Sequence, residues 1–126
     1  MIVGTGTDLM EIERIARSVE RFGGRFLDRI FTPAEQAYCL GKKSSAESFA
    51  ARFAAKEAGA KALGTGISRG VAWTEFEVTR ERGGKPGLHL RGRAGQLAAE
   101  LGVSRIHLSL THSRTAALAV VILERD

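Results

Sequence analysis

Hydrophobic and polar positions in the first third of the chain alternate with two periods, one typical of a strand and one of a helix. Ile2 and Val3 open an expected strand, and Asp8 follows it. From about Glu11 to Phe22, apolar residues recur at spacings of three and four. This spacing predicts an amphipathic helix, which a pair of glycines ends.

Two capping signals mark further helices in the middle of the chain. The segment 32–35, Thr-Pro-Ala-Glu, combines a capping box with proline at the first helical position, and it predicts a short helix to about Leu40. A second signal, Ser-Ser-Ala-Glu at 44–47, follows a basic loop and predicts a long helix. We expect that helix to end near Leu63, with Gly64 as its stop.

The second half of the chain reads mainly as paired strands. We expect a strand over 73–79, a glycine-rich turn over 83–87, a return strand from 88, a helix around 94–101, and closing strands over 106–110 and 116–123. The expected order is β-α-α-α-β-β-α-β-β. Grouped helices and hairpin-connected strands predict an α+β fold with a mostly antiparallel sheet, formed by residues 1–126 as one domain.

Composition and charge limit the kinds of partner that the chain can bind and the compartment that it suits. The net charge is +5 and the pI is about 10.0, which favours an anionic partner: nucleic acid, a phosphate-rich small molecule or an acidic protein. Only 6% of residues are aromatic, so few side chains are available to stack on the bases of a nucleic acid. The single cysteine, Cys39, excludes an intramolecular disulfide and predicts a packed thiol. The apolar stretch 116–123 is too short to span a membrane, so we expect a cytoplasmic protein.

Two acidic residues are the main candidates for chemistry. Asp8 and Glu57 lie far apart in sequence, and two carboxylates brought together by folding suit a magnesium ion that binds a phosphate. Each has a simpler alternative. Glu57 can form a helical ion pair with Lys61, four residues later, and Asp8 can cap the first helix or hold a turn.

Two glycine segments are weaker candidates for phosphate binding, and one histidine is a weaker candidate for catalysis. The glycines of 64–66 and 83–87 can cradle phosphate through backbone N–H groups, or they can be plain turns. His112, at the end of an expected strand, is either a general base or a hydrogen-bonded turn residue.

The first helix carries a stripe of arginines at 14, 17 and 21, opposite its apolar side. This stripe suits an acidic helix of a protein partner, and its alternative is a solvated face.

Together these segments resemble the holo-acyl-carrier-protein synthase family, the small bacterial type of 4′-phosphopantetheinyl transferase, over nearly the whole chain. The residues that carry the resemblance are Gly4-Thr5-Gly6-Thr7-Asp8 with Glu11 and Arg14, Phe31 to Glu35, Arg52 to Ala58, Lys61 to Gly66, Gly84-Lys85-Pro86, and Ser109 to Ser113. The helix motif around Glu57 is the most specific of them.

The resemblance implies the 4′-phosphopantetheinyl transferase fold and transfer of phosphopantetheine from coenzyme A to a serine of apo acyl carrier protein, a step of fatty acid biosynthesis that releases 3′,5′-ADP. It implies magnesium on Asp8 and Glu57, and Lys61 near the pyrophosphate. It places Arg52, Gly64-Thr65-Gly66, Gly84-Lys85-Pro86 and His112 in the coenzyme A site, between subunits of a homotrimer. It implies carrier docking on the arginines at 14, 17, 21 and 25. The proton acceptor stays open among Glu57, His112 and a metal-bound water.

Two other function classes remain open from the residues alone. One is a basic module that binds RNA or DNA, in which Asp8 and Glu57 are structural. The other is a non-catalytic trimeric adaptor that binds acidic proteins through the arginine stripe.

Overall fold

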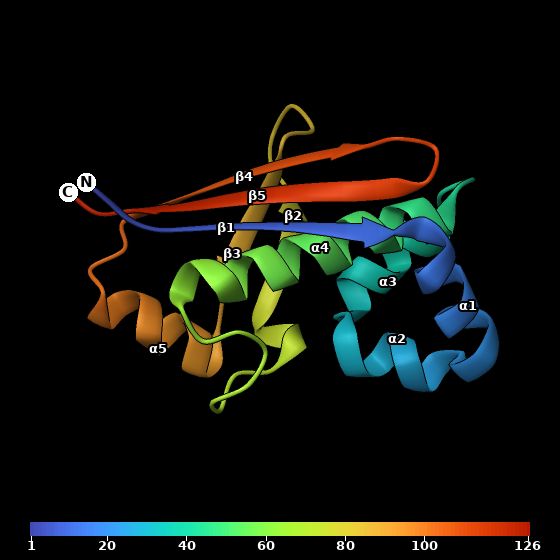
Figure 1. Cartoon of the computed structure of the whole chain (residues 1–126), viewed down its shortest axis with the longest axis horizontal. Coiled ribbons are helices and arrows are strands. Elements are labelled where there is room, and N and C mark those ends of the chain that lie inside the picture. Colours follow the sequence, from blue (N-terminus) through green and yellow to red (C-terminus); the bar gives the residue numbers. More distant parts are fainter.

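The computed structural model describes residues 1–126, which form five strands and five α-helices, the longest of which is α4 (Figure 1). The elements are β1 (Ile2–Glu11), α1 (Ile12–Phe22), α2 (Gly24–Ile30), α3 (Pro33–Leu40), α4 (Ser45–Leu63), the 3-10 turn η1 (Trp73–Glu75), β2 (Phe76–Arg80), β3 (Pro86–Leu90), α5 (Gly92–Glu100), β4 (Arg105–His112) and β5 (Ala116–Glu124).

The strands form two antiparallel sheets. One has the order β1-β5-β4, and the other is the β2-β3 hairpin. Helix α4 runs along one face of the three-stranded sheet, while α1, α2 and α3 gather at one end of the molecule and α5 lies towards the other (Figure 1). The predicted α+β class and antiparallel pairing are therefore confirmed.

The backbones of β1 and α4 lie in direct contact. A Cβ added at Gly4 or Gly6 would overlap the carbonyl oxygen of Ala62 or Ala58. The side of α4 that contacts these glycines carries Ala58 and Ala62. Six alanines of α4 in all are buried at 6% exposure or less: Ala50, Ala54, Ala55, Ala58, Ala60 and Ala62. Glycine on the strand and alanine on the helix thus bring the two elements close together.

A buried ion pair joins α3, α4 and β2. Lys56, on α4, is fully buried and donates hydrogen bonds to Glu35 Oε1 at 2.8 Å and to the carbonyl oxygens of Phe76 (2.6 Å) and Trp73 (3.2 Å). The second carboxylate oxygen of Glu35 accepts from the Val78 N–H at 2.7 Å. These bonds compensate for removing both charges from water.

The predicted capping box at 32–35 is confirmed. Thr32 Oγ1 accepts from the Glu35 N–H at 3.2 Å, and Glu35 Oε1 accepts from the Thr32 N–H at 2.8 Å. The same Glu35 carboxylate therefore both begins α3 and pairs with Lys56.

The structure corrects four local predictions. A helix that the sequence did not predict, α2, directly follows Gly23. The N-cap residue of α4, Ser44, makes no side-chain capping bond. Residues 73–75 form a 3-10 turn rather than the start of a strand. Asp8 lies within β1 rather than after it, and it does not cap α1, whose N-cap residue is Glu11.

Cys39 is fully buried, and this burial raises the pKa of its thiol to about 11. The prediction of a packed thiol is confirmed. None of the helices combines the length and apolar character that crossing a membrane requires.

The contact between β1 and α4 predicts a large cost for Gly6→Ala. The added methyl would overlap the Ala58 carbonyl oxygen and lie 2.8 Å from the Ala62 nitrogen, and neither backbone atom can rotate away. We expect the free energy of unfolding in urea to fall by roughly 1–3 kcal/mol or more. Gly24→Ala is the matched control, because no atom lies within 4 Å of its added Cβ. Equal urea midpoints for the two variants would contradict this account of the packing.

Candidate active site

The β1–α4 contact places Asp8 beside the last turns of α4. Asp8 points to the same face of β1 as Gly4 and Gly6, since side chains on alternate strand residues share a face. Lys61 Nζ donates to Asp8 Oδ1 at 3.1 Å and to the Thr7 carbonyl oxygen at 3.0 Å. The first predicted acid and the predicted lysine are thus neighbours in space.

Glu57 lies beside this pair without bonding to Lys61. Its carboxylate makes no hydrogen bond or ion pair, so the expected helical pair between Glu57 and Lys61 is wrong, and Lys61 binds Asp8 instead. Partial burial raises the pKa of Glu57, the negative charge of Asp8 raises it further, and Lys61 opposes the rise. Folding therefore brings the two carboxylates close enough to repel each other.

This arrangement has the donors that a hard cation requires. Asp8 Oδ2 is buried and has no hydrogen-bond partner, and such an atom is costly unless something binds it. No cluster of three or more acidic, histidine or cysteine side chains surrounds it. A set of two carboxylates fits magnesium, which commonly takes one or two carboxylates and fills its other positions with water and substrate phosphates.

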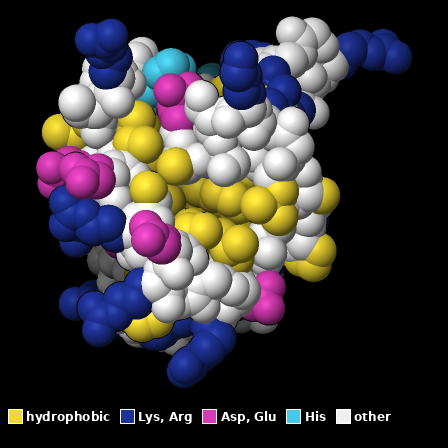
Figure 2. All heavy atoms as spheres, turned by 90° about the vertical axis from the view of Figure 1, so that its right-hand side faces the viewer, with side chains coloured by type: hydrophobic (Ala, Val, Ile, Leu, Met, Phe, Trp, Pro, Cys, Tyr) yellow, Lys and Arg dark blue, Asp and Glu magenta, His cyan; other side chains and the backbone are white.

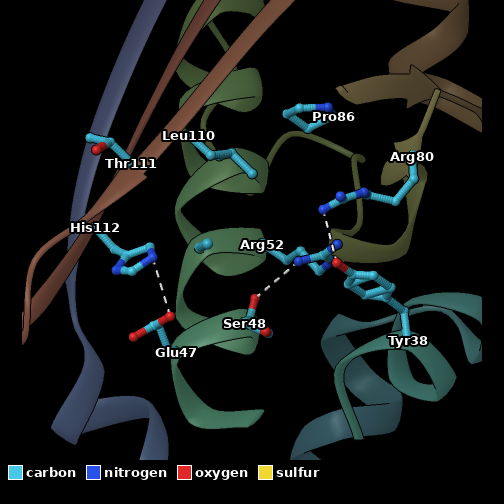
Figure 3. A pocket seen from close by; sticks show the side chains of 10 residues that line it. Tyr38, Glu47, Ser48, Arg52, Arg80, Pro86, Leu110, Thr111 and His112 are labelled. Atoms are coloured by element: carbon cyan, nitrogen blue, oxygen red, sulfur yellow. Dashed lines mark hydrogen bonds and ion pairs between the residues drawn. The ribbon is translucent and has the colours of Figure 1, made fainter. Parts of the chain in front are cut away.

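A second site, the Arg52 pocket, lies between α4, β4 and the start of β3 (Figure 3). It is lined by Tyr38, Glu47, Ser48, Ala51, Arg52, Arg80, Pro86, Leu110, Thr111 and His112. Arg52 is 5% exposed, yet it forms no ion pair. Its Nη1 donates a long bond of 3.4 Å to the Ser48 carbonyl oxygen, and its Nε has no partner. A buried, uncompensated guanidinium suits an anionic ligand.

His112 lies at the edge of this pocket, at the end of β4. Its Nε2 is 3.2 Å from Glu47 Oε1, and Figure 3 shows the two side chains pointing towards each other. The sequence suggested Glu47 only as part of a helix cap, so it gave no sign of this pairing. The simpler prediction for His112, a hydrogen-bonded turn residue, is incomplete, because the His112 ring also contacts Glu47 on α4.

The structure separates the other predicted binding residues. Pro86 lines the Arg52 pocket, whereas Gly84 and Lys85 are exposed in the β2–β3 turn. The segment 64–66 ends α4. Gly64 adopts the left-handed conformation, and the N–H groups of Thr65 and Gly66 donate to the Ala60 carbonyl oxygen. These two hydrogen bonds terminate α4, so both N–H groups are already used within the chain.

The carboxylate pair and the Arg52 pocket lie on different sides of α4. Arg52 and Glu57 are five residues apart, which separates them by about 140° around the helix axis and about 7.5 Å along it. Both sites can therefore take part in one reaction in only two ways. Either a long ligand reaches around α4, or one of the two sites is supplied by a second subunit.

Helices α1, α2 and α3 gather at the end of the molecule shown in Figure 2, where hydrophobic side chains line a hollow with basic and acidic side chains around it. Arg14, Arg17 and Arg21 are exposed as predicted, but Arg17 is paired with Glu13 at 2.9 Å. Arg25 lines a pocket with Phe22, Phe26 and Arg29. Arg25, Phe26 and Arg29 belong to α2, which the sequence did not predict.

The sequence analysis did not predict the pocket residues Tyr38, Glu47 and Arg80. Tyr38 and Arg80 lie outside any catalytic motif. Only the contacts between α3, α4 and β2 bring them together.

Known proteins share this architecture over its full length. The 4′-phosphopantetheinyl transferase superfamily model matches residues 4–121. Holo-[acyl-carrier-protein] synthases from Koribacter versatilis and Solibacter usitatus are each 56% identical to this chain over 124 residues, which is 98% of this chain and 99% of each relative.

Solved structures agree with these matches. The holo-[acyl-carrier-protein] synthase of Neisseria meningitidis has a TM-score of 0.89 at 38% identity, covering 99% of this chain and all of that one. The synthase of Bacillus anthracis, solved in complex with CoA (3′,5′-ADP), has a TM-score of 0.83 at 38% identity, covering 100% of this chain and 99% of that one.

The matched segment includes both the carboxylate pair and the Arg52 pocket. Identity above one half over nearly the full length of both chains, together with this fold, assigns the family. The chain belongs to the holo-[acyl-carrier-protein] synthases of the 4′-phosphopantetheinyl transferase superfamily.

Proposed function

We propose that this chain, acting as one domain, transfers the 4′-phosphopantetheine group from coenzyme A to a serine of apo acyl carrier protein and releases 3′,5′-ADP. The observation that carries the proposal is the carboxylate pair, with the unpartnered Asp8 Oδ2 beside Glu57 and Lys61, in a chain of this family. Related synthases from Bacillus anthracis and Helicobacter pylori were solved with coenzyme A, which supports the same co-substrate here.

Asp8 and Glu57 would hold magnesium, which would supply neutralising charge at the pyrophosphate. Lys61 uses two of its three N–H donors on Asp8 and Thr7, so the third is free for a phosphate oxygen. The serine oxygen of the carrier forms a bond to the phosphorus that bears pantetheine. The bond from that phosphorus to the departing 3′,5′-ADP then breaks.

The serine proton passes to a nearby base. Glu57 suits this role because its carboxylate lies beside the reaction site and makes no hydrogen bond or ion pair within the chain. His112 contacts α4 at Glu47, ten residues before Glu57 and about 15 Å away along the helix. His112 therefore takes part in the same reaction only if it comes from another subunit.

Three features support the proposed coenzyme A pocket, the acidic carrier and the cytoplasmic location. Arg52 and His112 line a pocket that suits a phosphate of coenzyme A, on the side of α4 away from Glu57. The exposed arginines of α1 suit an acidic carrier. The fully buried Cys39 requires no oxidising compartment, and we place the reaction in the cytoplasm.

The first test is the intact mass of an apo carrier protein after incubation with this chain, coenzyme A and magnesium. We expect the mass to rise by one phosphopantetheine group. Asp8→Asn and Glu57→Gln keep the side-chain shape but remove one charge each, and we expect either to slow transfer by at least about 100-fold while the thermal midpoint stays near that of the parent.

Unchanged carrier mass with the parent chain would favour an adaptor or a nucleic-acid-binding module. Full activity of either variant at low magnesium would exclude the carboxylate pair as the metal site.

We also propose a homotrimer with three sites between subunits, because the two halves of the site lie on different sides of α4. The sheet face that points away from α4 carries Leu118, Val120 and Ile122 on its central strand, with the exposed Leu9 on β1 beside them. An apolar patch of this kind suits contact with another copy of the chain.

Sedimentation velocity should give three times the 13.6 kDa of one chain. Val120→Glu places a charge on the outer sheet face, and we expect it to yield inactive monomers, since an unpaired charge is costly to bury. Ala99→Glu, on the exposed side of α5, is the control and should leave the trimer intact. A parent chain active as a monomer would overturn the assembly.

Carrier docking is the third part of the proposal. Arg14 and Arg21 on α1 and Arg25 on α2 are exposed, and none has an acidic partner, whereas Arg17 is partly neutralised by Glu13. The neighbouring Phe22 and Phe26 add apolar contact area. Charge there would steer an acidic carrier and chiefly raise its association rate.

Arg14→Glu combined with Arg21→Glu should raise the KM for carrier by about 10-fold or more and weaken its dependence on salt, because steering by opposite charge becomes repulsion. The KM for coenzyme A should stay within about 2-fold. Arg82→Glu, in the β2–β3 turn, is the charge-matched control. Loss of coenzyme A affinity with unchanged carrier affinity would assign these arginines to the nucleotide site instead.

A further inference from the structure

Lys56 is the only buried residue larger than alanine in the C-terminal half of α4. The same half of the helix carries Glu57 and Lys61, so its rotation decides where both of these side chains point. Burial of methyl groups is non-directional, so alanines let α4 lie close to its neighbours without selecting one rotation. The other buried positions between 54 and 62 are Ala54, Ala55, Ala58, Gly59, Ala60 and Ala62.

The Lys56 ammonium group uses all of its donors on groups outside α4. Its three N–H groups donate to the Glu35 carboxylate on α3 and to the carbonyl oxygens of Phe76 and Trp73. The same carboxylate accepts from two backbone N–H groups, one of them on β2. Hydrogen bonds weaken steeply when they lengthen or bend, so this set forms in only one arrangement of α3, α4 and β2.

A second contact between α4 and β2 supports the same arrangement. Gly59 lies three residues after Lys56, on the same side of the helix. A Cβ added at Gly59 would lie 3.1 Å from Cδ2 of Phe76, so the ring of Phe76 packs directly on the helix backbone. Phe76 therefore contacts α4 through its ring at Gly59 and through its carbonyl oxygen at Lys56.

These contacts lie opposite the contact between α4 and β1. Ala58, whose carbonyl oxygen lies against Gly6, is two residues after Lys56 and about 200° away around the helix axis. Helix α4 is thus held from two sides. The glycine contact sets its distance from β1, and the bonds of Lys56 set its rotation. Glu57 lies between the two contacts in sequence, so its place relative to Asp8 depends on both.

We propose that Lys56, paired with Glu35, is a positioning residue that fixes the rotation of α4 and so holds Glu57 where it can share a metal ion with Asp8. The inference rests on the proposed function, in which Asp8 and Glu57 hold magnesium, and it adds a residue that touches neither the ion nor the substrates. Magnesium demands near-ideal coordination geometry. Residues that only orient metal ligands are typically worth about 10–100-fold in metal affinity.

Two variants separate positioning from stability. Lys56→Met keeps an unbranched side chain but leaves the Glu35 charge unpaired in the core, so the thermal midpoint should fall by about 10 °C or more. Glu35→Gln combined with Lys56→Met removes both charges and should recover more than half of that loss, because no buried charge is left without a partner. Neither variant keeps the bonds from position 56 to the carbonyl oxygens of Phe76 and Trp73.

The readout is the affinity for Mn²⁺, which carboxylates bind as they bind magnesium. Free Mn²⁺ is measured by electron paramagnetic resonance with coenzyme A present and carrier absent, below the thermal midpoint of every variant. Both Lys56 variants should bind Mn²⁺ about 10-fold or more weakly than the parent, although the double variant has regained stability. Leu27→Ala is the matched control, because it opens a cavity in the core cluster of α1, α2 and α3. It should lower the thermal midpoint and keep the Mn²⁺ affinity within about 2-fold of the parent.

Parent-like affinity for Mn²⁺ in the double variant, or an equal loss of affinity in Leu27→Ala, would overturn the proposal, since metal binding would then follow stability alone. If the parent modifies the carrier while the double variant binds Mn²⁺ normally, the positioning role is wrong and the transferase remains. If the double variant loses Mn²⁺ but the parent modifies no carrier, the positioning role stands and the assigned reaction is wrong. A parent chain that binds no Mn²⁺ would refute the carboxylate pair as a metal site and this proposal with it.

Discussion

The backbone contact between β1 and α4 is the constraint on which both halves of the structure depend. Because Gly4 and Gly6 have no side chains, the helix lies directly on the strand, and Asp8 reaches the last turns of α4. A larger residue at either glycine would separate the carboxylates and lift the helix from the sheet. The same contact therefore sets the core packing and the distance between the two acids.

Helix α4 distributes one short motif among three environments. In the stretch 52–57, Arg52 lines the Arg52 pocket, Lys56 enters the core and pairs with Glu35, and Glu57 faces Asp8. In sequence these residues form one charged cluster. On the helix, the rotation of about 100° per residue points these three side chains to a surface pocket, to the core and to the second carboxylate. The burial of Lys56 also fixes the rotation of α4, and therefore the direction in which the other two point.

Features encoded by neighbouring residues were predictable from the sequence. The Thr32–Glu35 capping box requires only local backbone geometry, and it formed as expected. Helix α2 was missed because Gly23 and Gly24 mark a helix end, whereas here the second helix begins at the second glycine. Lys61 was assigned to Glu57 by helical spacing, but tertiary packing supplied a better partner in Asp8. The grouping of Tyr38, Glu47 and Arg80 at one pocket had no sequence signal, since its members come from three separate elements.

The pairing of β1 with β5 has a consequence for how the chain reaches its native state. The strands at the two ends of the described sequence are hydrogen-bonded neighbours, and β5 is the only strand that β1 pairs with. Helices α1 to α5 and the β2–β3 hairpin can begin to form from local contacts, but β1 has no partner until β5 is available. During synthesis on a ribosome, the edge of β1 therefore stays open until nearly the whole domain has emerged. The loop closed by this pairing is long, so we expect it to be a late step of folding.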